Sequence, residues 1–152
     1  ELAPVSRAVP SFLSGGGGLV STADDYLRFC DFLLRQGERD GVRLLGPRTV
    51  DYMTRNHLPG GSDLAGYARS MFAETAYAGV GFGLGFSVVV DPAANKVLTS
   101  PGTFSWGGAA STGFYVDPVE EVTALFMTQL LPSSTWPLLS QLTQLVSQAI
   151  LA

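Results

Sequence analysis

The sequence predicts an α+β fold in which helices pack on an antiparallel meander sheet. Two segments, residues 21–36 and 136–150, carry apolar side chains at the helical spacing i, i+3, i+4 and i+7. Between them, short apolar runs fill residues 80–128, and two of these runs end in Val-Asp-Pro. Because Asp followed by Pro is typical of tight turns, the runs predict two consecutive hairpins.

Composition narrows the partners that we expect. The 152 residues are enough for one domain with a sizeable core. Only 14% of them are charged, against roughly 25% in an average soluble domain, which suggests that something else covers part of the surface. The net charge of -4 argues against a nucleic-acid partner, and no apolar run approaches the ~18 residues of a membrane span.

Residue usage also bears on cofactors and processing. A single cysteine, Cys30, excludes an internal disulfide, and a single histidine, His57, excludes the usual clustered metal sites, so we expect no metal and no cofactor. The N-terminus has neither an initiator Met nor the pattern of a signal peptide, which predicts a cut or processed chain. Neither the single cysteine nor the single histidine determines the cellular compartment.

The chain divides into five parts. They are an N-terminal arm over 1–13, a helical part over 14–57, a loop over 58–79, antiparallel strands over 80–128 and a C-terminal helix over 133–152. The helical part opens with four glycines at 15–18. Because the Lys and Ser/Thr of a phosphate-binding loop do not follow them, we interpret this run as a tight turn.

The first helix has a capped start and a glycine end. Ser21 and Thr22 are both N-cap candidates, each with an aspartate three residues later. Cys30 lies on the apolar face of this helix, so we interpret it as a core residue rather than a nucleophile. Gly37 ends the helix.

A second, shorter helix is predicted from Pro47 to about Asn56, because proline favours the first helical position. His57 follows its end. One hypothesis makes His57 a base that works near neutral pH. We prefer the alternative that it binds the last carbonyls of the helix, because no Ser or Cys lies nearby for it to activate.

The strand region begins at Val80. Glycines alternate with large apolar residues over 81–86 and are followed by 87–90, which together predict one strand with a tightly packed glycine side. After a turn at Asp91-Pro92, a return strand is expected to begin at Lys96. Residues 122–128 are apolar on both faces, which predicts a central strand.

The C-terminal helix is expected to begin after a cap at Ser133, Ser134 or Thr135. Leucines dominate its apolar stripe, and Gln144 is expected on its outer side. Such a helix packs on one face of the sheet. Nothing in the chain is identified as the cover of the other face.

Residues 100–117 bring backbone close to something small. Gly107 and Gly108 have no Cβ, so another molecule is able to approach the main chain and its amide N–H groups, as at an edge strand that lines a ligand cleft. The alternative is a bulge or a barrel corner, in which the glycines serve geometry alone, and the glycine pair taken by itself favours this alternative because such pairs are common in strands.

Four segments carry a family resemblance. The sequence Ser-Gly-Gly-Gly-Gly-Leu-Val-Ser-Thr-Ala-Asp-Asp at 14–25, Arg-Leu-Leu-Gly-Pro-Arg-Thr-Val at 43–50, Gly-Phe-Gly-Leu-Gly-Phe at 81–86 and Trp-Gly-Gly-Ala-Ala-Ser-Thr at 106–112 together resemble the C-terminal half of the β-lactamase-related serine hydrolases. This group includes class C β-lactamases, D-Ala-D-Ala peptidases and esterases. The resemblance implies the C-terminal portion of that fold.

The resemblance also implies a role for the glycine pair. In penicillin-recognising relatives the corresponding strand reads Lys-Thr-Gly, which here matches Trp106, Gly107 and Gly108. The next amide, the N–H of Ala109, would then help to form the oxyanion hole. Trp106 departs from lysine, as in the esterase branch, and offers no cation for a substrate carboxylate, which favours neutral esters. The alternative is that Trp106 fills the core.

The family's Ser-x-x-Lys nucleophile is not found here. Lys96 is the single lysine, and the residue three before it is Ala93. The resemblance therefore implies an N-terminal portion of the same protein as the partner that carries the nucleophile, a small-molecule ester as the substrate, and no activity for this chain alone. The alternatives are β-lactamase or D-Ala-D-Ala peptidase activity, or a non-catalytic binding domain of the same fold.

Overall fold

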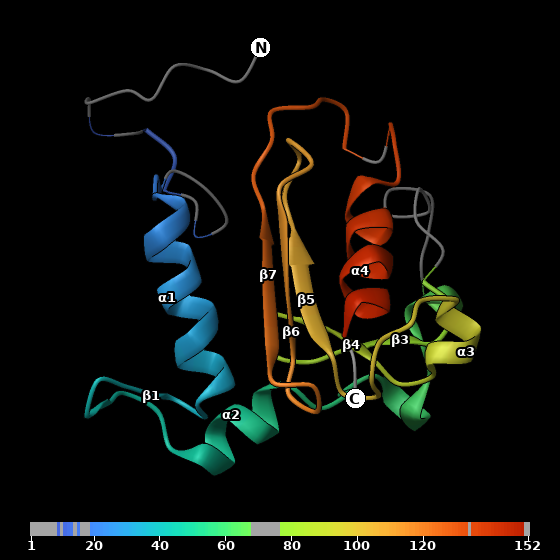
Figure 1. The fold of residues 1–152 in the computed structure, drawn as a ribbon, viewed down its shortest axis with the longest axis horizontal. Helices are drawn as coiled ribbons and strands as arrows, with labels where there is room; N and C mark the ends of the chain where they lie inside the picture. Colours follow the sequence, from blue (N-terminus) through green and yellow to red (C-terminus); the bar gives the residue numbers. More distant parts are fainter. Residues whose placement is uncertain are drawn as a thin grey trace.

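Two helices lie on opposite faces of an antiparallel sheet in the computed structural model of this chain (Figure 1). The structure describes residues 9, 11–13, 15, 19–67, 77–133 and 135–150. Most of the predicted arm and glycine turn lies outside these residues, as does the cap candidate Ser134. Within the described ranges, no helix has the length and apolar character needed to cross a membrane.

The sheet is an antiparallel meander, as the sequence predicts. In the described part of the chain, five strands pair in chain order: β3 (Val80–Phe82), β4 (Ser87–Val89), β5 (Phe104–Gly107), β6 (Gly113–Asp117) and β7 (Val122–Phe126). Each neighbouring pair is antiparallel. Residues that face each other across two strands point to the same side of the sheet.

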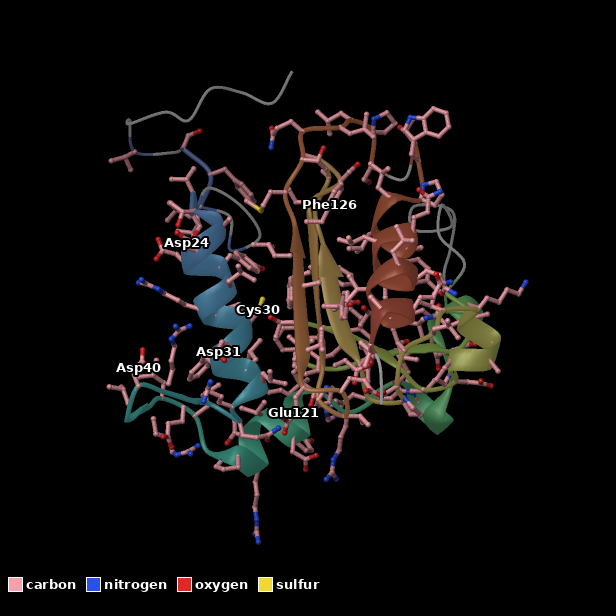
Figure 2. The ribbon with its side chains drawn as sticks, in the orientation of Figure 1. Asp24, Cys30, Asp31, Asp40, Glu121 and Phe126 are labelled. Atoms are coloured by element: carbon pink, nitrogen blue, oxygen red, sulfur yellow. The ribbon has the colours of Figure 1, made fainter. Side chains whose placement is uncertain are left out.

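One face of the sheet packs on helix α1 (Ala23–Leu34). Cys30 and Leu33 are 0% and 2% exposed and join Phe104, Phe114 and other apolar residues in the core. Figure 2 shows Cys30 pointing from α1 toward the sheet. The prediction of a core cysteine is therefore confirmed.

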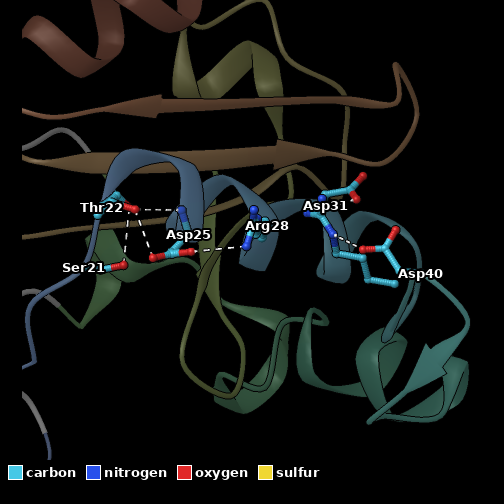
Figure 3. A network of polar contacts seen from close by, with 7 residues as sticks. Ser21, Thr22, Asp25, Arg28, Asp31 and Asp40 are labelled. Atoms are coloured by element: carbon cyan, nitrogen blue, oxygen red, sulfur yellow. Dashed lines mark hydrogen bonds and ion pairs between the residues drawn. The ribbon is translucent and has the colours of Figure 1, made fainter.

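Helix α1 starts and ends where the sequence predicts. Thr22 is the N-cap, and its Oγ1 accepts a hydrogen bond from the Asp25 backbone N–H at 3.1 Å (Figure 3). Gly37, with φ +83°, donates to the carbonyl of Phe32 at 2.9 Å. A Cβ at Gly37 would collide with Leu45, so glycine is required there.

The other face of the sheet packs on helix α4 (Leu138–Ala149). A Cβ at Gly113 of β6 would meet the Leu139 side chain at 2.6 Å, which places this helix directly on the strand. The expectation that one face stays uncovered by this chain is therefore wrong, because α1 and α4 each cover one.

Two details of α4 also differ from the prediction. Its N-cap is Pro137, which provides no side-chain cap. Gln144 accepts a hydrogen bond from the Leu98 N–H at 3.1 Å rather than facing outward.

The remaining elements are short and connect these layers. They are β1 (Glu38–Arg39), β2 (Val42–Arg43), α2 (Pro47–Met53), η1 (Pro59–Gly61), η2 (Leu64–Gly66) and α3 (Pro92–Asn95). Helix α2 ends three residues earlier than predicted. His57 then contacts the carbonyl of Tyr52 through Nε2 at 2.7 Å, which confirms that it binds a carbonyl at the helix end.

The strand predicted over 81–90 is a hairpin instead. Gly83 donates to the carbonyl of Phe86 at 2.8 Å, and Gly85 adopts φ +98°, so the chain turns between β3 and β4. The tight packing of the glycines is real, because a Cβ at Gly81 would collide with Asn56. The alternating glycines thus reflect both a close approach and a turn.

Two further strand predictions are wrong. Asp91 caps α3 by accepting from the Ala94 N–H at 3.1 Å, and Lys96 ends this helix in the left-handed conformation, so the return strand begins only at Phe104. Strand β7 lies at the edge of the described sheet rather than in its centre. Its apolar residues pack on α1, which explains their character without a second neighbouring strand.

Candidate functional site

The Trp-Gly-Gly stretch extends past the end of its neighbouring strand. Strand β4 pairs with β5 only at Phe104 and Ser105. On the other side, β5 pairs with β6 along its whole length, up to Gly107. Within the described part of the chain, Trp106 and Gly107 therefore lie on a free edge of β5.

The hydrogen-bond pattern fixes which backbone groups face this edge. Gly108 donates to the carbonyl of Thr112 at 2.8 Å, toward β6. Backbone groups of successive residues in an extended strand point to opposite sides. The N–H and C=O of Gly107 therefore point away from β6, toward the free edge.

A tight turn follows and is anchored at both ends. Ser111 donates its backbone N–H to the carbonyl of Gly108 at 3.0 Å and its hydroxyl to the carbonyl of Leu130 at 2.8 Å. Leu130 in turn donates to the carbonyl of Ala110 at 3.0 Å. Ala109 lies exposed within this turn, and its N–H makes no hydrogen bond to any residue that the structure describes.

The glycine pair also has a geometric reason. A Cβ at Gly107 would lie 3.1 Å from the Thr112 carbonyl oxygen, and one at Gly108 would lie 2.8 Å from its Oγ1. The sequence does not reveal Thr112 as the neighbour that makes both positions tight. The same glycines leave the backbone of the free edge unshielded. Their lack of a side chain therefore both avoids a clash with Thr112 and leaves the backbone accessible.

Trp106 is not enclosed by the core. Its side chain is 39% exposed, and its ring meets that of Phe82 edge-to-face with the centroids 5.1 Å apart. Edge-to-face aromatic pairs hold both rings in a preferred orientation. Trp106 is therefore a partly fixed apolar surface beside the free edge.

The charged residues of α1 and the β1–β2 hairpin pair largely with one another. Arg28 pairs with Asp25 at 3.6 Å (Figure 3). Asp31 lies 2.8 Å from Arg35 and 3.4 Å from Arg39. These pairs are exposed or partly exposed and contribute little to stability. The residues around Gly107 and Ala109 are uncharged in sequence from Ser100 to Val116.

Cys30 and His57 are not parts of this site. Burial raises the pKa of the Cys30 thiol to about 11, which keeps it protonated and unreactive at neutral pH. His57 lies beside Tyr52, with the ring centroids 4.6 Å apart, and its Nε2 is already engaged with a backbone carbonyl. Neither group is available as a nucleophile or base at the β5 edge.

The family of this chain follows from a match over almost its whole length. A family model described as Beta-lactamase matches residues 2–147. The chain belongs to the beta-lactamase family. As expected for that family, helices cover an antiparallel sheet, and the predicted fold class is confirmed.

Beta-lactamase family relatives include several longer proteins. Protein Rv1367c of Mycobacterium tuberculosis (strain ATCC 25618 / H37Rv) is 42% identical over 134 residues, which cover 86% of this chain and 32% of that protein. Esterase EstB of Burkholderia gladioli is 31% identical over 118 residues, which cover 78% of this chain and 26% of that protein. The chain thus spans a quarter to a third of the length of these curated relatives.

Two solved structures resemble this chain in fold. EstCE1, described as a hydrolase with promiscuous acyltransferase activity, matches with a TM-score of 0.59 and 30% identity, covering 78% of this chain and 27% of that one. Simvastatin synthase LovD from Aspergillus terreus matches with a TM-score of 0.69 and 24% identity, covering 89% of this chain and 35% of that one. The second likeness concerns the fold alone.

Proposed function

We propose that this chain is the C-terminal part of a serine hydrolase that acts on carboxylic esters through an acyl-enzyme. The observation that carries the proposal is the free edge of β5, where the Gly107 backbone and the Ala109 N–H have no described partner. Family membership and the likeness to an esterase and to a hydrolase with acyltransferase activity support the same reaction class.

In this proposal the nucleophile comes from an N-terminal portion of the same protein that carries Ser-x-x-Lys. Its serine Oγ attacks the ester carbonyl and gives its proton to a tyrosine base of the same N-terminal portion. The oxygen of the tetrahedral intermediate accepts a hydrogen bond from the Ala109 N–H, and the base returns the proton to the alcohol as it leaves. Water then hydrolyses the acyl-enzyme. One preorganised donor of this kind contributes about 3–4 kcal/mol to the stabilisation of the transition state.

The side chain of Trp106 is the reason that we propose neutral esters as substrates. An indole offers no cation, so a substrate carboxylate would lose water without gaining a charged partner. The partly exposed ring instead provides an apolar surface for the acyl or alcohol group. β-Lactams and D-Ala-D-Ala peptides carry such a carboxylate, and we therefore expect them to be poorer substrates.

Hydrolysis of p-nitrophenyl butyrate tests the proposal. The complete protein should turn the ester over, whereas residues 1–152 alone should stay at the rate of the blank. Turnover by residues 1–152 would contradict an upstream nucleophile. No turnover by the complete protein with p-nitrophenyl esters from acetate to octanoate would favour a non-catalytic binding domain.

A further inference from the structure

The Trp106 ring rests against Phe82, a residue of a strand that does not pair with β5. The two ring centroids lie 5.1 Å apart, with an interplanar angle of 77°. Strand β4 lies between β3, which carries Phe82, and β5, which carries Trp106. Because β4 pairs with β5 only as far as Ser105, the two rings meet beside the free edge of β5.

The backbone of Phe82 is fixed on the outer edge of the sheet. Its N–H donates to Asn56 Oδ1 at 3.1 Å, and its carbonyl accepts from the His57 N–H at 2.8 Å. Both groups come from the segment that follows helix α2. Hydrogen bonds of this kind oppose local opening of an edge strand. The position of the Phe82 ring is therefore set by contacts outside its own hairpin.

Asn56 joins this edge to the loop after α2. Besides its bond to Phe82, Oδ1 accepts from the Leu58 N–H at 3.0 Å, and Nδ2 donates to the Ser62 carbonyl at 2.8 Å. A Cβ at Gly81 would collide with the Asn56 side chain, so the amide lies directly on β3. An amide that uses both its oxygen and its nitrogen in this way has one orientation.

Trp106 depends on such a neighbour for its own orientation. Its side chain is 39% exposed, and a partly exposed side chain changes rotamer readily unless another residue restricts it. The edge-to-face contact with Phe82 provides that restriction. Contacts thus run from Asn56 through Phe82 to the apolar surface beside Gly107.

We propose that Phe82 is a positioning residue that holds the Trp106 ring as the wall for the acyl chain of the substrate, and that Asn56 holds Phe82 in place for this role. The inference rests on the proposed ester hydrolysis, because a preference among substrates requires turnover. Neither Phe82 nor Asn56 takes part in the chemical step. Loss of the Phe82 ring should therefore alter the discrimination between long and short acyl chains.

The ratio of kcat/KM for p-nitrophenyl octanoate to that for p-nitrophenyl acetate tests this role in the complete protein. Phe82→Leu keeps an apolar side chain and the backbone hydrogen bonds but removes the aromatic ring. It should lower the ratio about two- to tenfold, the change that corresponds to one aromatic pair. Phe82→Tyr keeps the ring and should retain the wild-type ratio. The control is Leu84→Ala, at an exposed residue of the adjoining turn, which should also retain it.

A Trp106→Ala background separates positioning from a general structural effect. The ring that Phe82 would hold is absent there, so adding Phe82→Leu should leave the ratio unchanged. Asn56→Ala should lower the ratio in the wild-type background and leave it unchanged in Trp106→Ala. If Asn56→Ala does not fold, the Phe82 variants carry the test, because they keep the Asn56 hydrogen bonds.

Near-UV circular dichroism follows Trp106 without any turnover. The signal of this residue is the difference between the spectra of the wild type and Trp106→Phe, whatever other tryptophans the complete protein contains. This difference should shrink in the Phe82→Leu background, because an aromatic side chain that loses its fixed packing loses near-UV dichroism.

Three results would overturn the inference and leave the proposed function standing. They are a wild-type ratio in Phe82→Leu with turnover intact, an equal fall of the ratio when Phe82→Leu is added to Trp106→Ala, and an undiminished Trp106 dichroism in Phe82→Leu. Absence of turnover of both esters by the wild type is a different outcome. It would remove the proposed function itself and, with it, the preference that Phe82 serves.

Discussion

Asp117, at the end of β6, is the most heavily hydrogen-bonded single side chain of the sheet. Its carboxylate accepts from the Ser100 N–H at 3.0 Å, the Thr103 hydroxyl at 2.8 Å, and the N–H groups of Val119 and Glu120 at 3.0 and 3.2 Å. Burial by itself raises the pKa of this carboxyl. The four donors outweigh burial and hold the pKa below its ordinary value.

Replacing this carboxylate should therefore destabilise the fold in a pH-dependent way. Asp117→Asn should lower the free energy of unfolding by about 2–3 kcal/mol at pH 6, because hydrogen bonds to a charged group are lost. A lowered folded-state pKa gives stability that is complete above the unfolded pKa of about 3.9 and is lost as the pH falls through the folded value. Urea unfolding at pH 6 and pH 3 should show a smaller difference between variant and wild type at pH 3. An equal difference at both would contradict this account.

Cys30 provides a second test at the scale of one residue. It is fully buried, and burial raises its thiol pKa to about 11. We expect Ellman's reagent at pH 8 to leave the native thiol unmodified for hours and to modify it within minutes in 6 M guanidinium chloride. Fast modification of the native protein would mean that α1 does not stay packed on the sheet.

Trp106 is the residue to which we assign the proposed preference for neutral esters. In the complete protein, Trp106→Ala should change the relative kcat/KM for nitrophenyl esters of different chain length, because a partly fixed apolar surface is removed. Trp106→Phe, which keeps an aromatic surface, is the matched control and should retain more of the preference. An unchanged pattern across the ester series in Trp106→Ala would remove the role proposed for this residue.

Among the secondary-structure elements, helix α4 depends on close contact with β6. Gly113 faces Leu139, and a side chain there would overlap the leucine. Gly113→Val should destabilise the protein by about 1–3 kcal/mol, as overpacking does. Gly15→Val is the control, because a Cβ at Gly15 meets nothing within 4 Å. Equal melting temperatures for both variants would show that α4 is not held against this strand.

Elements whose signals are local were predictable from the sequence. Thr22 and Gly37 define the two ends of α1 through contacts within a few residues, so their roles could be predicted. The β3–β4 hairpin could not, because alternating glycines satisfy a strand pattern equally well. Only the packing of Gly81 against Asn56, 25 residues earlier in the chain, and the positive φ of Gly85 distinguish the turn.

For the whole molecule, the arrangement of layers was beyond the sequence pattern. The apolar stripe of α4 identifies its buried face only in part, because Leu145 is exposed and the buried residue of this helix is Thr143. An apolar stripe also does not say on which side of the sheet a helix lies. Strand β7 shows the same limit, since its apolar residues pack on α1 and do not require a neighbouring strand on each side. The buried Tyr115 hydroxyl, which has no hydrogen-bond partner among the described residues, has no signature in the sequence, because its pairing depends on what surrounds that position.

The candidate site was predictable in part. The position of Gly107 and Gly108 in a strand with exposed backbone follows from their lack of a side chain. The free edge follows from where β4 stops pairing, at Ser105, and this is a property of the assembled sheet. The proposed roles of Trp106 and Ala109 rest on the family resemblance and stay predictions.

The most direct test of the central proposal locates the nucleophile. A fluorophosphonate that inactivates serine hydrolases should be reacted with the complete protein, and the labelled peptide should be identified by mass spectrometry. We predict one label, on the serine of a Ser-x-x-Lys sequence upstream of residues 1–152, and loss of ester hydrolysis in proportion to labelling. A label on any serine within residues 1–152, or full labelling without loss of hydrolysis, would contradict the proposal.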